Sequence, residues 1–359
     1  MIIKIKSLPY WSKQKEKMYN ILKVFRLFIV GIFGLITTVT AGTADIKGSI
    51  ISFNGTAREA YVGEFVRGLR ATAKLKGFDI KVLENQFNQI EQDQQVQQIL
   101  ALDELPDAFI WWPVDDANGL VSLQALAETG VPILKINQLP NDLDKQYIIG
   151  FAGSNDSLRA RNAGYMMREA AAARKAAGFT GFNVLVLSYP HSYDGYGRSI
   201  DAFKEAIAGS ELKIIWDFDE GFGPENGYKS ATKFIMAKQD QSIDFVYGMD
   251  DGILAGGIKA LEESGIIIGK DVIAVGTVCN GDKKLIENGK QFGTTLQSPL
   301  LEGQLAIKLI EEYLDTGKLA DFINFTPNPP ITKKTIETAA LRGFDGKLYS
   351  IEELCSGIW

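Results

Sequence analysis

The sequence predicts an α/β protein with parallel sheets, built as two similar lobes. Residues 109–136 and 243–278 each contain, in the same order, a short apolar run, an acidic turn, an amphipathic stretch and a second apolar run. Parallel strands need a crossover of this kind between them. A single doubly wound domain would repeat the pattern as well, so the repetition favours two lobes without excluding one.

The second of these segments places two carboxylates, Asp250 and Asp251, after the largely apolar run 243–247. Ligands of open parallel sheets bind beyond the carboxyl ends of the strands. Asp250 is therefore expected to contact a ligand, with capping of the following helix as the alternative. Asp251 is expected to be the helix cap, and Asp115 and Asp116 are expected to be caps or charges at the rim of the site.

The remaining strands and helices alternate along the chain. Strand-length apolar runs lie at 46–53, 78–83, 109–113, 133–136, 147–151, 183–187, 212–218, 243–247, 272–275 and 292–296. Helical spacing of apolar residues predicts helices at 61–75, in the second half of 85–98, and at 120–126, 154–177, 200–207, 228–237, 253–261 and 300–314. Gly77, Gly130 and Gly265 follow three of them, where a left-handed residue is favourable.

Composition narrows the class of protein. A length of 359 residues fits two domains, and a net charge of −6 argues against nucleic acid as a partner. His191 is the only histidine, which argues against Cys/His zinc sites. Cys279 and Cys355 can form one disulfide in an oxidising compartment, but the sequence does not show whether they are close. We expect no metal and no cofactor.

The N-terminal segment has the pattern of a secretory signal. Residues 1–26 are rich in lysine, Leu27–Val39 is mostly apolar and uncharged, and small residues follow. We assign 1–44 as a signal peptide cleaved after Ala41 or Ala44, which predicts a periplasmic protein. The apolar run is short for a membrane-spanning helix, although an uncleaved anchor is the alternative.

Several stretches carry a resemblance to a known family: ISFNGTAREAYVGEFVRGLRATAKLKGF, VPILKIN, VYGMDDGILAGGIKAL, VGTVCNGD and GTTLQSPLLEG. In order and spacing they resemble the type I periplasmic substrate-binding proteins of ABC transporters, ribose/galactose-binding branch. The resemblance implies two Rossmann-like lobes with parallel sheets joined by a three-crossing hinge. The N-terminal lobe would comprise 45–152 plus 298–325 and the C-terminal lobe 153–297, with 326–359 as hinge crossing and tail.

The resemblance also implies which positions face the cleft between the lobes. Trp112 replaces an asparagine of the family pattern, Asn137-Gln138 replaces Asp-Arg, and Asn280 stands near a missing aspartate. Gln297 keeps the family's glutamine. The expected ligand-binding residues are Asn54, Glu59, Tyr61, Trp112, Asn137, Tyr193, Tyr196, Arg198, Asp250, Asn280 and Gln297, with no catalytic residue among them.

These residue types suit a sugar, which presents hydroxyl groups that donate and accept hydrogen bonds and apolar faces that aromatic rings cover. Trp112 is preferred to Trp111 for the ligand because neighbouring strand residues point to opposite faces of a sheet. Arg198 would otherwise pair with Asp194 or Asp201. His191 is expected to be a solvated loop residue, and Gln297 has a hinge hydrogen bond as its alternative role.

We therefore expect an extracytoplasmic solute-binding protein, a monomer that captures a sugar or polyol by hinge closure and delivers it to an ABC permease. A receptor that feeds a membrane sensor kinase and a binder of an amino-bearing solute are the alternatives. An enzyme is not expected, because the sequence has neither a G-x-G-x-x-G after its first strand nor a Walker loop. A transcriptional regulator of similar fold is disfavoured by the secretion signal.

Overall fold

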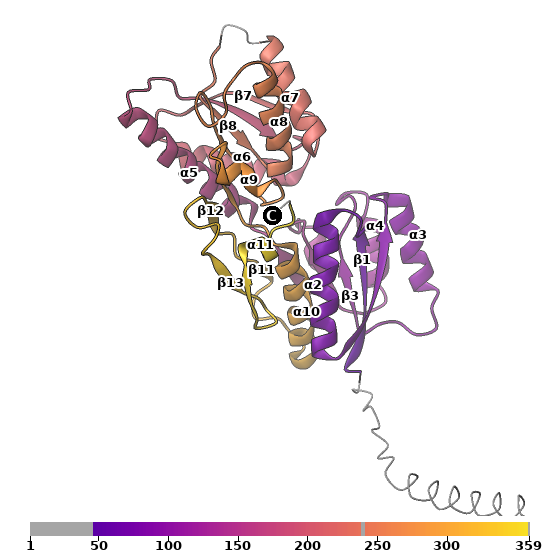
Figure 1. Ribbon diagram of the computed structural model, residues 1–359. Helices are drawn as coiled ribbons and strands as arrows, with labels where there is room; N and C mark the ends of the chain where they lie inside the picture. The colour runs from indigo at the N-terminus through magenta and orange to yellow at the C-terminus, as the bar shows by residue number, and fades with distance from the viewer. Residues whose placement is uncertain (1–45, 238–240, 358–359) are drawn as a thin grey trace, which may run out of the picture. The chain divides into compact units, whose positions relative to one another are not determined.

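The computed structural model describes residues 46–237 and 241–357, and Figure 1 labels its helices and strands. The predicted signal peptide lies outside the described residues. Within the described ranges, none of the helices combines the length and the apolar character that crossing a membrane requires.

The first sheet has the strand order β11-β5-β4-β3-β1-β2, and its neighbouring strands are parallel. Its strands are β1 (Gly48–Gly55), β2 (Phe78–Asn85), β3 (Ala108–Trp111), β4 (Ile133–Ile136), β5 (Gly150–Gly153) and β11 (Ile323–Phe325). Helices α2 (Ala60–Lys76) and α10 (Pro299–Thr316) cover one face, and α3 (Gln89–Leu100) and α4 (Leu120–Ala127) cover the other (Figure 1). A short 3-10 helix, η1 (Asp144–Gln146), follows β4.

The second sheet has the order β12-β10-β9-β8-β6-β7, in which only β12 is antiparallel to its neighbour among the described strands. Its strands are β6 (Asn183–Ser188), β7 (Lys213–Asp219), β8 (Phe245–Gly248), β9 (Ile273–Val275), β10 (Gln291–Thr295) and β12 (Pro330–Thr332). Its helices are α5 (Asp156–Ala176), α6 (Asp194–Ile207), α7 (Pro224–Ala237), α8 (Asp251–Glu263) and α9 (Lys283–Glu287).

Each sheet has its own buried core, so the two sheets form two lobes. The chain passes from the first sheet to the second after β5, returns after β10 and passes again after β11. The predicted α/β fold with two mostly parallel lobes and three crossings is therefore confirmed. The C-terminal tail, residues 333–357, adds the hairpin β13 (Ala340–Arg342) and β14 (Leu348–Ser350) and helix α11 (Ile351–Leu354).

Helices α2 and α10 pack closely because small residues lie where they meet. A side-chain carbon on Gly68 would lie 2.2 Å from the backbone oxygen of Leu300, and one on Gly303 would lie 2.3 Å from that of Phe65. Distances this short leave no room for an added methyl group between the two helices. The close contact brings the first turns of the two helices together, and both turns carry residues of the candidate site.

Candidate functional site

Five of the eleven expected ligand residues lie within two residues of the carboxyl end of a strand. Asn54 is the next-to-last residue of β1, Trp112 directly follows β3, and Asn137 directly follows β4. In the second lobe, Asp250 follows β8, and Gln297 follows β10 where the chain returns to the first lobe. In parallel sheets these ends share one edge, so side chains distant in sequence are brought into one region.

In the first lobe the hydroxyl of Tyr61 is the centre of a hydrogen-bonded group. It donates to Glu302 Oε2 at 2.7 Å and accepts from Gln297 Nε2 at 2.7 Å and from Asn137 Nδ2 at 3.5 Å. The ring of Trp112 meets that of Tyr61 edge-on, with centroids 6.0 Å apart. We call these five residues the Tyr61 cluster.

Glu302 was missed by the sequence reasoning. It is buried. Burial raises the pKa of Glu302 to about 7, against the lowering effect of hydrogen bonds from Tyr61 and Asn137. A signal was available, because Glu302 lies at helical spacing from Leu305, Ala306 and Leu309 on the apolar face of its helix.

The other expected residues of the first lobe differ in burial. Asn54 is fully buried; its Oδ1 accepts from Ser52 Oγ at 2.6 Å, and its Nδ2 lacks a hydrogen-bond partner within the described ranges. Glu59 is exposed at the N-cap of α2 and makes no capping bond. Trp111 and Trp112 lie on opposite faces of the sheet, and both are buried, at 1% and 8% exposure.

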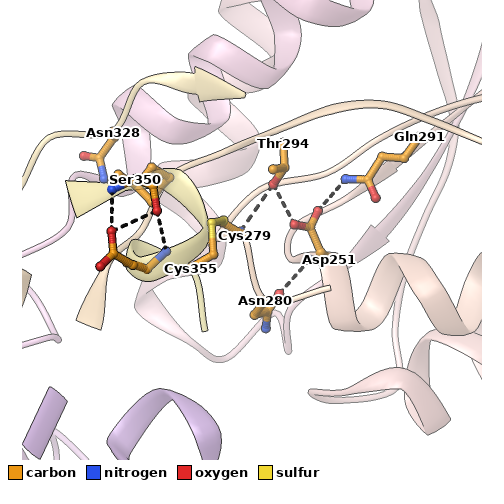
Figure 2. The surroundings of a disulfide bond; sticks show 10 residues. Asp251, Cys279, Asn280, Gln291, Thr294, Asn328, Ser350 and Cys355 are labelled. Carbon is orange, nitrogen blue, oxygen red and sulfur yellow. Dashed lines mark hydrogen bonds between the residues drawn. A yellow bond between two sulfur atoms is a disulfide. The ribbon is translucent and has the colours of Figure 1, made fainter. Parts of the chain in front are cut away.

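In the second lobe the start of α8 is held by two side chains. Asp250 is the N-cap, with Oδ1 accepting from the amide of Ile253 at 2.7 Å. Asn280 Oδ1 accepts from the amides of Asp251 at 3.0 Å and Gly252 at 3.2 Å, and Figure 2 shows the first of these bonds. Four amides at a helix start lack partners inside the helix, and these two residues satisfy three of them.

The expectation that Asp251 caps α8 was wrong, because the helix begins at Asp251 itself, one residue earlier than that assignment requires, and Asp250 is the N-cap. The Asp251 carboxylate is buried and accepts from Gln291 Nε2 and Thr294 Oγ1, both at 2.7 Å (Figure 2). Burial raises its pKa to about 7, while those two hydrogen bonds oppose the rise. Burial also raises the pKa of Asp250.

Arg198 pairs with neither Asp194 nor Asp201. Its Nη2 and Nε both donate to Asp156 Oδ2, at 2.9 and 3.2 Å. The other oxygen of Asp156 accepts from Arg159 Nη2 at 2.6 Å, so one carboxylate bridges two guanidinium groups. Arg159 is 4% exposed, and its Nε makes no hydrogen bond within the described part of the chain. We call these three residues the Asp156 bridge.

The sequence reasoning missed Asp156 and Arg159. Both lie in the first turn of α5, directly after the first crossing between the lobes. An acidic and a basic residue three positions apart at such a point were the available signal. Their pairing with Arg198 depends on the packing of α5 against α6 and is not visible in local sequence.

Three aromatic rings meet next to the second sheet. Tyr189, Tyr193 and Phe222 have centroid distances of 5.7 Å (Tyr189 to Tyr193), 5.2 Å (Tyr189 to Phe222) and 5.5 Å (Tyr193 to Phe222). Phe222, which the sequence reasoning did not single out, is 53% exposed and leaves apolar surface open to solvent.

Tyr196 has different partners from Tyr193. Its hydroxyl donates to Asp217 Oδ2 at 2.8 Å, and its ring stacks on His191 at 4.2 Å. His191 also has Ser188 Oγ 3.3 Å from its Nε2. The histidine, expected to be solvated, is exposed but has these partners.

The acidic turn after β3 has two roles. Asp115 Oδ1 accepts from the amide of Asn118 at 2.8 Å, as expected for a cap of the turn. Asp116 accepts at 2.6 Å from Lys135, whose fully buried ammonium group also pairs with Asp144. A buried lysine with two carboxylates holds the loops after β3 and β4 together.

The charged groups of the two lobes influence one another. Burial is the main reason that the pKa of Glu302 is raised, and the negative charge of Asp156 adds to the rise. Burial likewise raises the pKa of Tyr61, and the positive charge of Arg159 opposes it. The Tyr61 cluster and the Asp156 bridge are therefore parts of one electrostatic environment.

A two-lobed α/β fold with polar and aromatic side chains at the sheet edges defines a class of ligand-binding proteins. A family model described as periplasmic binding protein domain matches residues 50–319. The chain belongs to this family.

Solved structures show the same fold. A galactofuranose binding protein is 20% identical, with a TM-score of 0.69, and the match covers 80% of this chain and 95% of that one. A periplasmic ribose ABC transporter protein from Conexibacter woesei is 22% identical, with a TM-score of 0.68, and the match covers 82% and 95%.

A curated protein with a different role also matches in sequence. The HTH-type transcriptional repressor PurR of Glaesserella parasuis is 24% identical over 228 residues, which is 60% of this chain and 57% of the repressor. The chain thus matches little more than half the length of that relative.

Proposed function

We propose that this chain is an extracytoplasmic solute-binding protein that captures a neutral sugar or polyol between its lobes and delivers it to an ABC permease. The observation that carries the proposal is a pair of buried polar atoms without hydrogen-bond partners among the described residues: Asn54 Nδ2 in the first lobe and Arg159 Nε in the second. An unsatisfied buried polar group is unfavourable by about 1–3 kcal/mol, which a ligand hydroxyl removes.

The charges of the site support a neutral ligand. The negative charge of Asp156 balances one of the two arginines that bind it, Arg159 and Arg198. The nearby carboxylate of Asp250 balances the other positive charge. Burial raises the pKa of Glu302 to about 7, so near neutral pH its carboxyl can donate a hydrogen bond as well as accept one. Neutral groups that donate and accept match hydroxyls better than an ammonium group.

An amino-bearing solute receives less support. Asp250 and Glu59 are the carboxylates that would bind an ammonium group, but one Asp250 oxygen caps α8 and Glu59 is exposed to water. The aromatic rings of Trp112, Tyr193 and Phe222 favour a ligand with apolar C–H faces.

The proposal includes export of the protein from the cytoplasm and closure of its two lobes on the ligand. The three chain passages between the sheets would form the hinge, with the lobes at 45–152 plus 298–325 and 153–297. Ligand contacts from both lobes would stabilise the closed form, and a permease, or alternatively a sensor kinase, would recognise it. The signal pattern at 1–44 and the periplasmic family support an extracytoplasmic location.

The test is a thermal-shift and calorimetry screen of residues 45–359 against pentoses, hexoses, polyols, amino sugars and amino acids. A ligand at about 100 times its Kd adds about 2.7 kcal/mol to the free energy of unfolding, which is easily detected. A sugar or polyol is expected to bind. Binding of amino acids alone, or of nothing, would refute the proposed ligand class.

A matched pair of variants then locates the site. Arg198→Ala should weaken binding of the identified sugar at least about tenfold, because it removes a site guanidinium and leaves Asp156 with one partner. Arg161→Ala removes an exposed arginine of α5 that pairs with Glu205, and it should leave the Kd unchanged. Equal affinities of the two variants would contradict the placement of the site.

A further inference from the structure

We propose that the disulfide between Cys279 and Cys355 positions Asn280 at the start of α8, so that the C-terminal tail is a structural part of the ligand half-site in the second lobe. The inference rests on the proposed function only where it names a ligand. It assigns a role to a bridge whose existence the sequence left open.

The loop that carries Cys279 has an unfavourable backbone. Val278 and Cys279 have φ angles of 80° and 64°, in the left-handed region. Residues with a side chain rarely adopt it, and β-branched valine least of all. Two such residues in succession persist only where neighbouring groups hold them.

Four contacts hold this loop, one of which is the hydrogen bond that the amide of Gln297 donates to the Val278 carbonyl at 3.3 Å. The bridge joins Cys279 to Cys355 with their Cα atoms 5.2 Å apart, and the amide of Ser356 donates to the Cys279 carbonyl at 3.2 Å. The amide of Cys279 donates to Thr294 Oγ1 at 3.3 Å (Figure 2). Two of the four contacts come from the tail, and the disulfide is the covalent one.

The held conformation sets the position of the next residue, Asn280. Its Oδ1 binds the amides of Asp251 and Gly252, the first two of helix α8. Asp250, the proposed ligand residue, immediately precedes them. If the backbone at 278–279 relaxed to negative φ, the direction of the chain would change and Asn280 would leave these amides.

The tail is fixed at its other side to the first lobe. Tyr349 Oη accepts from Gln304 Nε2 at 3.1 Å, and Gln304 Oε1 accepts from the amide of Phe344 at 2.9 Å. Gln304 lies on α10, two residues after Glu302 of the Tyr61 cluster. The tail thus connects the helix that carries Glu302 with the loop that carries Asn280, in addition to the three chain crossings.

The experiment is amide hydrogen exchange, resolved at Asp251, Gly252 and Ile253, on ligand-free residues 45–359. In the variant Cys279→Ala/Cys355→Ala we expect exchange at Asp251 and Gly252 to be about tenfold faster, because without the bridge a residue with a side chain at position 279 relaxes from the left-handed conformation. Ile253 should change less, since Asp250 binds its amide. Cys279→Gly/Cys355→Ala should exchange more slowly than the alanine variant, because glycine adopts positive φ freely.

Unchanged exchange at Asp251 and Gly252 in a folded alanine variant would overturn the inference, as would equal rates in the alanine and glycine variants. If the alanine variant does not fold, the wild type is compared before and after treatment with a trialkylphosphine. The reagent converts the disulfide to two thiols and becomes the phosphine oxide, with the oxygen and both protons coming from water. Unchanged exchange after confirmed reduction would overturn the inference equally.

A second experiment measures the affinity of the wild type and of the two double variants for a sugar that binds the wild type. The alanine variant should bind it about tenfold more weakly, with the glycine variant between the two. Equal affinity of the wild type and the alanine variant would remove the tail from the half-site. If no sugar binds the wild type, the proposed function fails, and the exchange rates still decide whether the bridge positions Asn280.

Discussion

Replacing Tyr61 with phenylalanine tests the centre of the first-lobe cluster. The change removes one oxygen, which donates to Glu302 and accepts from Gln297, each at 2.7 Å. The ring and its edge-on contact with Trp112 remain. The variant therefore isolates the hydrogen bonds from the packing.

The size of the effect depends on the charge of Glu302. A hydrogen bond between neutral groups contributes about 1 kcal/mol and one to a charged group about 1.5–3 kcal/mol. Below pH 5 the carboxyl of Glu302 is protonated in the folded protein, because its pKa is raised to about 7. We expect Tyr61→Phe to lower the free energy of unfolding by about 1 kcal/mol at pH 5 and by about 2–3 kcal/mol at pH 8.

The sign follows from linkage. A carboxyl whose pKa is raised by folding stabilises the protein below its unfolded pKa of 4.5, and this stabilisation is lost as the pH rises through about 7. The bond from Tyr61 lowers the pKa of Glu302 and so limits that loss. Without the bond, the pKa rises further and the loss between pH 5 and pH 8 becomes larger.

Urea unfolding at pH 5 and pH 8 measures the difference, from the midpoint and slope of each transition. Tyr165→Phe is the control, since Tyr165 is 51% exposed and should change stability by less than about 0.5 kcal/mol. A cost for Tyr61→Phe that is the same at both pH values, or below about 0.5 kcal/mol at pH 8, would refute the reasoning.

Three further changes test other parts of the fold. Lys135→Met should lower the free energy of unfolding by about 3–5 kcal/mol, because two carboxylates lose their buried cation. The control Lys145→Met removes an exposed ion pair and should change the free energy of unfolding by less than about 0.5 kcal/mol. Equal values for the two variants in denaturant titrations would contradict this prediction. Asp250→Ala should lower the free energy of unfolding by about 1 kcal/mol, because α8 loses its N-cap, and it should also weaken sugar binding. An unchanged thermal midpoint and an unchanged Kd would count against Asp250 as a helix cap and as a ligand residue. Gly68→Ala should cost about 1–3 kcal/mol, because its methyl group would meet the Leu300 carbonyl; calorimetry that shows no loss would mean that α2 and α10 can separate freely.

The local sequence was sufficient to predict the class of fold. Strand runs and helical spacing are short-range signals, and a glycine at Gly77 or Gly130 marks a helix end through its own backbone freedom, at φ of 78° and 76°. Alternating strands and helices admit few topologies, so the location of Asn137 and Asp250 at strand ends followed as well.

Which side chains meet depends on how the helices and strands pack in three dimensions. Glu302 contacts Tyr61 across 241 positions, because two helices pack through glycines. Asp156 reaches Arg198 across 42 positions through the packing of α5 on α6. These distances depend on the arrangement of whole elements, which no local pattern encodes.

Dependence on three-dimensional packing also explains why the α8 cap was assigned to the wrong aspartate and why the disulfide was left open. Asp250 and Asp251 are neighbours, and a shift of one residue in the helix start decides which of them caps α8 and which is buried beside Thr294. The pairing of Cys279 with Cys355, 76 positions apart, required the tail to pack against α10 and the loop after β9. Local sequence patterns thus specify the helices and strands and their order, whereas side-chain partners depend on how whole helices and strands pack against one another.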